Sequence, residues 1–501
     1  MAVSALVLVL IAALPGRAAA AAAPPAPRPV VAQEEVALLL QSARKKLEDR
    51  DYDGAIADAT KALEKDPEEA SGFLVRGLAY MAKGANEKAL EDFATGSSSA
   101  PGAAVFLRCR AEVCLRMKRY DEALSEIKVA LDLDEKDAEA LALRGRVHEA
   151  RKELDAAAAA YEAAIAADPT RPQPLALRGA LRMRRRDLQG ALADLTAAAG
   201  LDPNSSSLRR RRGEVRAKMC DYDGAIEDFG KAMELAPGSA APVRERGGAK
   251  YDKGDYDGAA ADFTKSIEMD PRAASSYRSR ARARMYAAKA DLDGALADAA
   301  KAVELEAANP FSYGTLADVM EARGDAAGAL AELDRAVQAA PADGGAYRVR
   351  GHGLYERQSW AAALKDFRKA CELDPEDQDY SRLLIWILRA RSGEREEATK
   401  ELAAWLRDRK VAGQDEEWYP RIGAMLVGTL SEADFLKVVE TKEPYKTRER
   451  RSEGFFYAGA RRLVAGDRAS AESLFRRCID AGVKNYYEHQ GAAAELKALR
   501  K

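Results

Sequence analysis

Small and apolar residues recur along the chain at a fixed interval of 34 residues. Glycine or alanine opens each cycle, an alanine follows twelve residues later, and an acidic and then an aromatic or aliphatic residue come three and four positions beyond it. A cycle of this length is typical of a helix–turn–helix unit, which cannot bury its apolar face alone and must stack on copies of itself. The pattern therefore predicts a solenoid of antiparallel helix pairs.

Two columns of small residues carry the pattern. The opening column is Gly77, Ala111, Gly145, Gly179, Gly213, Gly247 and Ala281. The alanine column is Ala55, Ala89, Ala123, Ala157, Ala191, Ala225 and Ala259. Small side chains let two helices approach closely, and larger ones would overpack the contact. The register then slips by two positions within 287–293 and resumes at Ala295, which predicts one longer turn between two paired helices.

A column of arginines precedes the opening small residues. Its members are Arg76, Arg110, Arg144, Arg178, Arg212, Arg246 and Arg280. Acids occupy the matching position of most second helices: Asp58, Asp92, Glu126, Asp194, Asp228 and Asp262. We expect these two columns to form structural ion pairs, which define register more than they add stability, because desolvation offsets much of the attraction.

The succession of Gly or Ala, then Ala, then an aromatic residue, then Pro, repeated every 34 residues, resembles the tetratricopeptide repeat (TPR). The resemblance covers roughly Val36 to Lys410. It implies an all-α fold, a right-handed α-solenoid of about 11–12 TPR helix–turn–helix repeats with a C-terminal capping helix. We therefore expect a TPR array at 36–410.

The C-terminal part departs from this array and resembles the corresponding region of NlpI-like bacterial TPR proteins. The residues that carry this resemblance are Trp418-Tyr419-Pro420, Leu430-Ser431, Phe456-Tyr457-Ala458-Gly459 and the segment from Gly482 to His489. We place a helical connector at 411–451 and a terminal TPR-like unit with its capping helix at 452–501. The resemblance implies a scaffold that organises other proteins of the cell envelope, and a free solenoid face in such families often supports a homodimer.

The first residues are typical of a secretory signal. An apolar run from Ala2 to Leu14 ends at Pro15-Gly16, and the alanines from Ala18 to Ala23 offer small-x-small cleavage sites. We expect a signal peptide at 1–23, a disordered Pro/Ala linker at 24–35, and an exported, periplasmic or envelope-associated protein with no integral membrane span in the mature chain. An uncleaved anchor and a misplaced start codon are the alternatives. No cysteine near the cleavage region provides a lipidation site.

Composition and motifs argue against most other classes of function. The 79 basic and 81 acidic residues give a net charge of -2, which offers no general attraction to nucleic acid or membrane. None of the five cysteines has the spacing of a zinc site, and His148, His352 and His489 lie in no metal-binding or nucleophile motif. We expect no catalytic residues, no cofactor and no metal.

A second arginine column lies two residues before the first and, by analogy with TPR proteins, faces the concave groove. With neighbouring side chains it gives the candidate partner-binding residues Arg210, Arg244, Arg278, Arg282, Arg348, Tyr251, Tyr286 and Tyr355. Guanidinium groups bind carboxylates, so the expected ligands are acidic segments or C-terminal carboxylates of other proteins or peptides. Arg210 has Glu214 one helical turn away and is expected to pair with it.

Three functions follow from these observations. The first is a non-catalytic, exported scaffold that mediates protein–protein interactions in the cell envelope. The second is a cytoplasmic TPR adaptor that binds peptide C-termini, which requires residues 1–23 to be retained. The third is an enzyme with its site in 413–451, for which the sequence offers no catalytic constellation.

Overall fold

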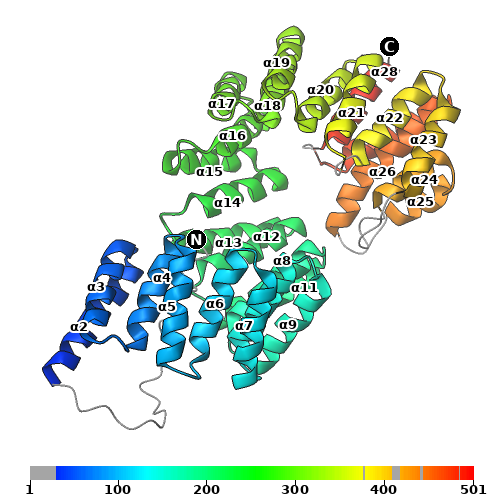
Figure 1. The fold of residues 1–501 in the computed structure, drawn as a ribbon. Helices are drawn as coiled ribbons and strands as arrows, with labels where there is room; N and C mark the ends of the chain where they lie inside the picture. The colour runs from blue at the N-terminus through cyan, green and yellow to red at the C-terminus, as the bar shows by residue number, and fades with distance from the viewer. Residues whose placement is uncertain (1–29, 376–378, 409–417, 440–443, 484–485, 501) are drawn as a thin grey trace. The chain divides into compact units, whose positions relative to one another are not determined.

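The structure, a computed structural model, describes residues 30–375, 379–408, 418–439, 444–483 and 486–500. Within these residues the chain forms 27 α-helices and no strand (Figure 1). The chain divides into two compact units, one holding the described residues up to Arg184 together with Thr196–Asp202, the other holding Arg185–Leu195 and the described residues from Pro203 onward. The helix α11 (Leu188–Leu201) contributes to both units. The all-α prediction is confirmed.

The first unit consists of consecutive helix pairs. Its helices are α2 (Val30–Glu48), α3 (Tyr52–Lys65), α4 (Ala70–Ala82), α5 (Asn86–Ser99), α6 (Ala104–Arg116), α7 (Tyr120–Leu133), α8 (Ala138–Ala150), α9 (Leu154–Ala167) and α10 (Pro172–Arg184). The helix α2 begins before the array start expected at Val36, so it overlaps the linker expected at 24–35. The remainder of that linker and the expected signal peptide lie outside the described residues.

The second unit continues with the same pairing. Its repeat helices are α12 (Ser206–Lys218), α13 (Tyr222–Leu235), α14 (Ala240–Lys253), α15 (Tyr256–Met269), α16 (Ala274–Tyr286), α17 (Leu292–Leu305), α18 (Pro310–Ala322), α19 (Ala326–Ala339), α20 (Gly344–Glu356), α21 (Trp360–Leu373), α22 (Asp379–Arg391) and α23 (Arg395–Asp408). Its remaining helices are α24 (Trp418–Val427), α25 (Glu432–Val439), α26 (Pro444–Val464), α27 (Arg468–Asp480) and α28 (Tyr487–Leu499). We call the first helix of each pair the A helix and the second the B helix.

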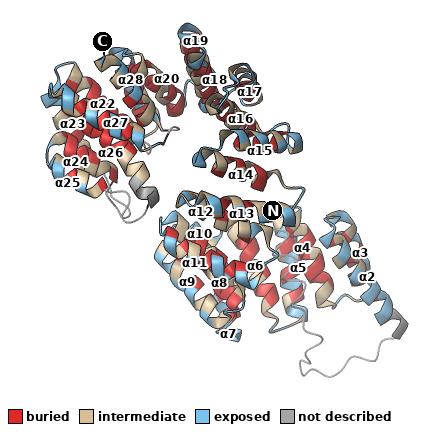
Figure 2. Cartoon of the chain, turned by 180° about the vertical axis from the view of Figure 1, so that it is seen from behind, coloured by how far each residue is buried: buried red, intermediate tan, exposed pale blue. Residues whose placement is uncertain are grey.

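In several pairs a small residue on helix A lies under a ring on helix B. A Cβ atom added to Gly145 would lie 2.4 Å from the ring of Tyr161, and one added to Gly247 would lie 2.9 Å from the ring of Phe263. Such distances are shorter than atoms tolerate, so only a very small residue permits this approach. The buried residues accordingly lie on the faces where stacked helices meet (Figure 2).

The expected ion pairs between the two columns are confirmed in most repeats. Arg246 donates from Nε and Nη2 to the two carboxylate oxygens of Asp262, at 2.9 and 2.6 Å. The same arrangement joins Arg76 to Asp92, Arg212 to Asp228, Arg280 to Asp298 and Arg350 to Asp366, and Arg110 pairs with Glu126. These acids are mostly buried, and each one is neutralised by a bidentate guanidinium from the partner helix or by a single ion pair.

The turns between paired helices follow the sequence closely. Gly254 ends α14 with a φ of 96°, a conformation that favours glycine, and the Asp255 side chain caps α15 by accepting from the Gly258 amide at 2.9 Å. The register slip is confirmed as a longer turn. Residues 287–291 separate α16 from α17, whereas only residues 323–325 separate α18 from α19.

The C-terminal helices depart from the simple pairing and build the largest core of the chain. Trp418 of α24 stacks on Phe435 of α25 with ring centroids 5.4 Å apart, and both pack against α26. The helix α26 crosses residue 451, where we placed the boundary between connector and terminal unit. The last helix, α28, packs on α26, α27 and the repeat helix α20. Across the described residues, no helix combines the length and the apolar character that crossing a bilayer requires.

A buried charge at the alanine column tests the assigned register. Ala225 has no exposed surface between α12 and α13. We expect Ala225→Asp to lower the free energy of unfolding of its repeats by about 3–5 kcal/mol, because it buries an uncompensated carboxylate. Thermal unfolding followed by circular dichroism measures the change. The control is Glu227→Asp on the exposed face of the same helix, and equal melting curves for the two variants would contradict the register.

Candidate functional site

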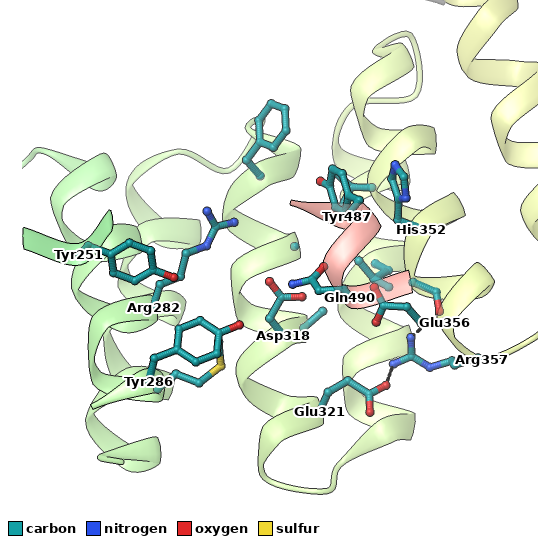
Figure 3. Close-up of a pocket in the computed structure, with 17 residues that line it drawn as sticks. Tyr251, Arg282, Tyr286, Asp318, Glu321, His352, Glu356, Arg357, Tyr487 and Gln490 are labelled. Atoms are coloured by element: carbon teal, nitrogen blue, oxygen red, sulfur yellow. Dashed lines mark hydrogen bonds and ion pairs between the residues drawn. The ribbon is translucent and has the colours of Figure 1, made fainter. Parts of the chain in front are cut away.

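A cavity of about 180 Å³ opens between the A helices of the second unit and the C-terminal helix (Figure 3). The successive A helices α14, α16, α18 and α20 provide most of its lining, and α28 adds Tyr487 and Gln490. In a stack of helix pairs the A helices share one face, so equivalent repeat positions become neighbours there. Side chains from four successive repeats therefore meet in this cavity.

Three arginines of the expected groove column bind acids of their own chain. Arg210 pairs with Glu214, as expected, and also with Glu245 at 2.6 Å. Arg278 lies 3.4 Å from both a Glu306 carboxylate oxygen and the Ser312 hydroxyl.

The third of these arginines, Arg348, has its guanidinium 3.6 Å from a carboxylate oxygen of Asp374. The column is therefore largely neutralised from within the described chain, in ways that spacing along a single helix does not reveal.

The candidate tyrosines have different environments. Tyr251 and Tyr286 line the cavity and, with Tyr256, form an aromatic cluster whose ring centroids are 5.2–6.3 Å apart. Tyr355, by contrast, is 3 % exposed and donates to Glu495 of α28 at 2.7 Å. The structure therefore places Tyr355 in the core under α28 and away from any groove rim.

Two further predicted residues have no ion pair with any described residue. Arg282 lines the cavity beside Tyr251 and Tyr286, and Arg244 lies one repeat earlier on α14. The structure thus brings Tyr251, Arg282 and Tyr286 together, while the remaining candidate residues are paired, buried or outside the cavity lining.

The opposite wall of the cavity carries acids that sequence reasoning missed. Asp318 of α18 and Glu356 of α20 are half-buried there, and neither forms a hydrogen bond or ion pair with a described residue. Glu321 differs, because it binds Arg357, whose guanidinium also donates to the Gly353 carbonyl at 2.7 Å. Figure 3 shows Asp318 between Tyr286 and Gln490, in the middle of the lining residues.

Burial shifts the pKa values of the titratable side chains on this wall. It raises the pKa of Glu356 to about 8, with repulsion from Asp318 as the next cause. Burial also raises the pKa of Asp318, although the nearby Arg282 guanidinium acts in the opposite direction. His352, whose ring stacks on Tyr487 at 3.7 Å, is kept neutral because burial lowers its pKa to about 3.

Contacts far apart in sequence fix α28 as the end wall. Glu495 accepts hydrogen bonds from Tyr355 of α20 and from Arg391 of α22. Gly491 lies against Phe456, where an added Cβ would come within 2.9 Å of the ring. Because α28 is anchored to three other helices of the second unit, the cavity has a defined wall on this side.

The described part of 413–451 contains core residues. Trp418 donates from its ring nitrogen to the buried Glu453, which also accepts from Tyr380 at 2.6 Å. Burial and repulsion from Glu488 raise the pKa of Glu453 to about 8. The described residues hold no group of three or more His, Cys, Asp or Glu arranged to bind a metal ion.

The repeat register of the sequence could have indicated Asp318. Asp318 follows Arg282 by 36 residues, which is one repeat plus the two extra residues of the long turn. It therefore occupies the repeat position of Arg282, with the charge reversed. Counting repeats with the slip included finds Asp318, but nothing in the periodic pattern places Tyr487 and Gln490 beside it.

Because the pKa of Glu356 is raised, we expect its replacement by glutamine to stabilise the protein in a pH-dependent way. Glu356 keeps its proton up to about pH 8 in the folded state and loses it near 4.5 when unfolded, so it reduces stability progressively as the pH rises between these values. We expect Glu356→Gln to raise Tm at pH 8 by about 2–4 °C and to have no effect at pH 4. Differential scanning calorimetry at both pH values measures this.

The exposed Glu268→Gln on α15 is the control for that measurement, because this carboxylate stays solvated. A Glu356→Gln effect of equal size at pH 4 and pH 8 would contradict the assigned burial of the carboxyl.

Comparison with known proteins identifies the repeats. Residues 40–104, 110–172 and 315–378 match the tetratricopeptide repeat family, and they lie within both compact units. No curated protein matches the chain significantly.

Among solved structures, yeast Tom70 is 16 % identical, with 82 % of this chain and 100 % of that chain covered at a TM-score of 0.46. A tetratricopeptide repeat protein from Parabacteroides merdae is 19 % identical over 50 % of this chain and 97 % of its own, with a TM-score of 0.42. YrrB, a TPR protein with an unusual peptide-binding site, is 22 % identical over 36 % and 94 %, with a TM-score of 0.31. The three matched segments show that this chain contains tetratricopeptide repeats.

Proposed function

We propose that this protein is a non-catalytic scaffold that binds a segment of another protein along the A helices of its second unit, and that it acts outside the cytoplasm, in the cell envelope. The observation that carries the proposal is the cavity among α14, α16, α18, α20 and α28. It combines aromatic walls with a small number of charged groups, the composition that binding sites usually have.

The rim of the cavity favours a protein ligand. Phe311, the second residue of α18, lines the cavity and is 46 % exposed. Aromatic residues are enriched in protein interfaces and contribute much of their binding free energy once a partner covers them. A partner segment that runs across the A helices would cover Phe311 and insert a side chain beneath it.

The envelope location rests on the sequence features of residues 1–23 and on the resemblance of the C-terminal region to NlpI-like proteins. A cytoplasmic adaptor for peptide C-termini is the alternative. Arg210, Arg278 and Arg348 bind acids of the same chain. Of the candidate arginines, Arg244 and Arg282 are therefore left to bind an acidic ligand.

The mass of the protein from its native cell tests the location. Export removes a signal peptide, so we expect the N-terminus to lie within or just after 18–23, a loss of roughly twenty residues. Intact-mass spectrometry with N-terminal sequencing measures it. A retained Met1 or Ala2 in the isolated protein would favour the cytoplasmic adaptor.

Site-specific photo-crosslinking tests the groove. We place p-benzoylphenylalanine at Phe311 and, as a matched control, at Leu235, which is 39 % exposed at the end of α13 and away from the cavity lining. We expect position 311 to crosslink a partner protein in intact cells and position 235 not to crosslink it. Crosslinks of equal yield at both positions, or at neither, would overturn the groove as the partner-binding face.

A further inference from the structure

We propose that the cavity accepts a basic side chain, a lysine or an arginine, from the partner segment, and that Asp318 and Glu356 provide its counter-charges. This inference rests on the proposed function, because it names the chemistry of the segment that the groove binds. It differs from the acidic ligands expected from the arginine column.

The charge balance of the lining is the first reason. The titratable and charged groups that face the cavity are Tyr251 from α14, Arg282 and Tyr286 from α16, Asp318 and Glu321 from α18, His352 and Glu356 from α20, Arg357 directly after α20, and Tyr487 from α28. Arg357 is bound to Glu321, and His352 is neutral. Two carboxyl groups therefore share one remaining guanidinium, that of Arg282, and neither is in ion-pair contact with it.

When both carboxyl groups are ionised, the lining is short of one positive charge, and a cationic ligand would supply it. A buried carboxylate is strongly disfavoured unless a cation or several hydrogen bonds compensate it. The chain provides no such contact to Asp318 or Glu356 within the described residues. An ammonium or guanidinium group placed between them forms charge-assisted hydrogen bonds, which are about twice as strong as neutral ones.

An independent observation points to a ligand in the same cavity. The hydroxyl oxygen of Tyr251 is fully buried at the cavity wall and has no hydrogen-bond partner among the described residues. Buried hydroxyl groups are nearly always hydrogen-bonded. A phenolic oxygen accepts from an N–H donor, and a cationic side chain supplies that donor.

The shape and the walls suit a long cationic side chain. A cavity of about 150 Å³ holds a benzene ring, so the volume of about 180 Å³ has room for a lysine or arginine side chain. Tyr251, Tyr286 and Tyr487 present aromatic rings to this space. Cations bind favourably over such rings, and the attraction increases when water is excluded.

Binding of a cation carries a proton signature. At pH 7 Glu356 is mostly protonated, because its pKa is about 8. A cation beside it favours the charged form, so Glu356 releases its proton to the solvent as the ion pair forms. Proton release therefore distinguishes a basic ligand from an acidic one, which would stabilise the protonated carboxyl instead.

Titration calorimetry with defined peptides tests the inference on the purified full chain. The probe is an acetylated and amidated hexapeptide of alternating Gly and Lys, and its comparison peptide has Glu in place of Lys. We expect the Lys peptide to bind more tightly, with release of about one proton at pH 7 and almost none at pH 9, measured in buffers of different ionisation enthalpy. Asp318→Asn and Glu356→Gln are each expected to weaken binding about tenfold or more, and Glu356→Gln to abolish the proton release.

A matched control removes two acids elsewhere. Glu268→Gln with Glu397→Gln neutralises exposed carboxylates of α15 and α23, and we expect it to leave the affinity unchanged. Circular dichroism confirms that each variant is folded. Equal binding by wild type and Glu356→Gln, tighter binding of the Glu peptide, or no binding of the Lys peptide would each overturn the inference.

The two proposals fail separately. If a partner crosslinks at position 311 but binding of the Lys peptide does not depend on Asp318 and Glu356, the scaffold proposal stands and the basic-ligand proposal fails. Binding of the Lys peptide that depends on both acids, without any crosslinked partner, retains the pocket chemistry and removes the scaffold role of the groove.

Discussion

The fit of a glycine or alanine on most A helices beneath a ring or branched side chain on the B helix is the contact on which the rest of the structure depends. Gly247 under Phe263 and Gly145 under Tyr161 bring the two helix axes close enough to bury the alanine column completely. A helix pair made this way still exposes one apolar face, so the next pair must cover it. The fixed repeat length of the sequence reflects this requirement, because each pair must present the same face to the next.

The geometry that packs the small residues against the rings also brings the arginine and acid columns into ion-pair contact. Residues 16 apart face each other across one helix pair, which places Arg246 against Asp262 just as it places Gly247 against Phe263. Desolvation offsets much of the attraction in such pairs, so their main effect is to exclude other registers. An arginine held this way is not available to a ligand. Function is therefore expected where a repeat departs from the pattern.

The fold was predictable because it depends on contacts that recur, whereas the site was only partly predictable because it depends on contacts that occur once. The columns correctly indicated helix pairs, the ion pairs and the long turn at 287–291. They also brought Tyr251, Arg282 and Tyr286 into one cavity. They failed for Tyr355, because the residues that bury it belong to α28, 140 positions away at Glu495. No repeat register contains that contact.

The reversal from Arg282 to Asp318 at one repeat position shows how a repeat array acquires a specific site. Exchanging charge at an A-helix position leaves the packing columns untouched, so the fold tolerates the change. The cost appears instead at the Asp318 carboxyl, whose pKa is raised by burial in a cavity that α28 helps to line. A partner that supplies a cation relieves this cost, so part of its binding free energy comes from offsetting the unfavourable burial of the carboxyl group in the free protein. Selectivity for a basic side chain then comes from the missing positive charge more than from the groups that line the cavity.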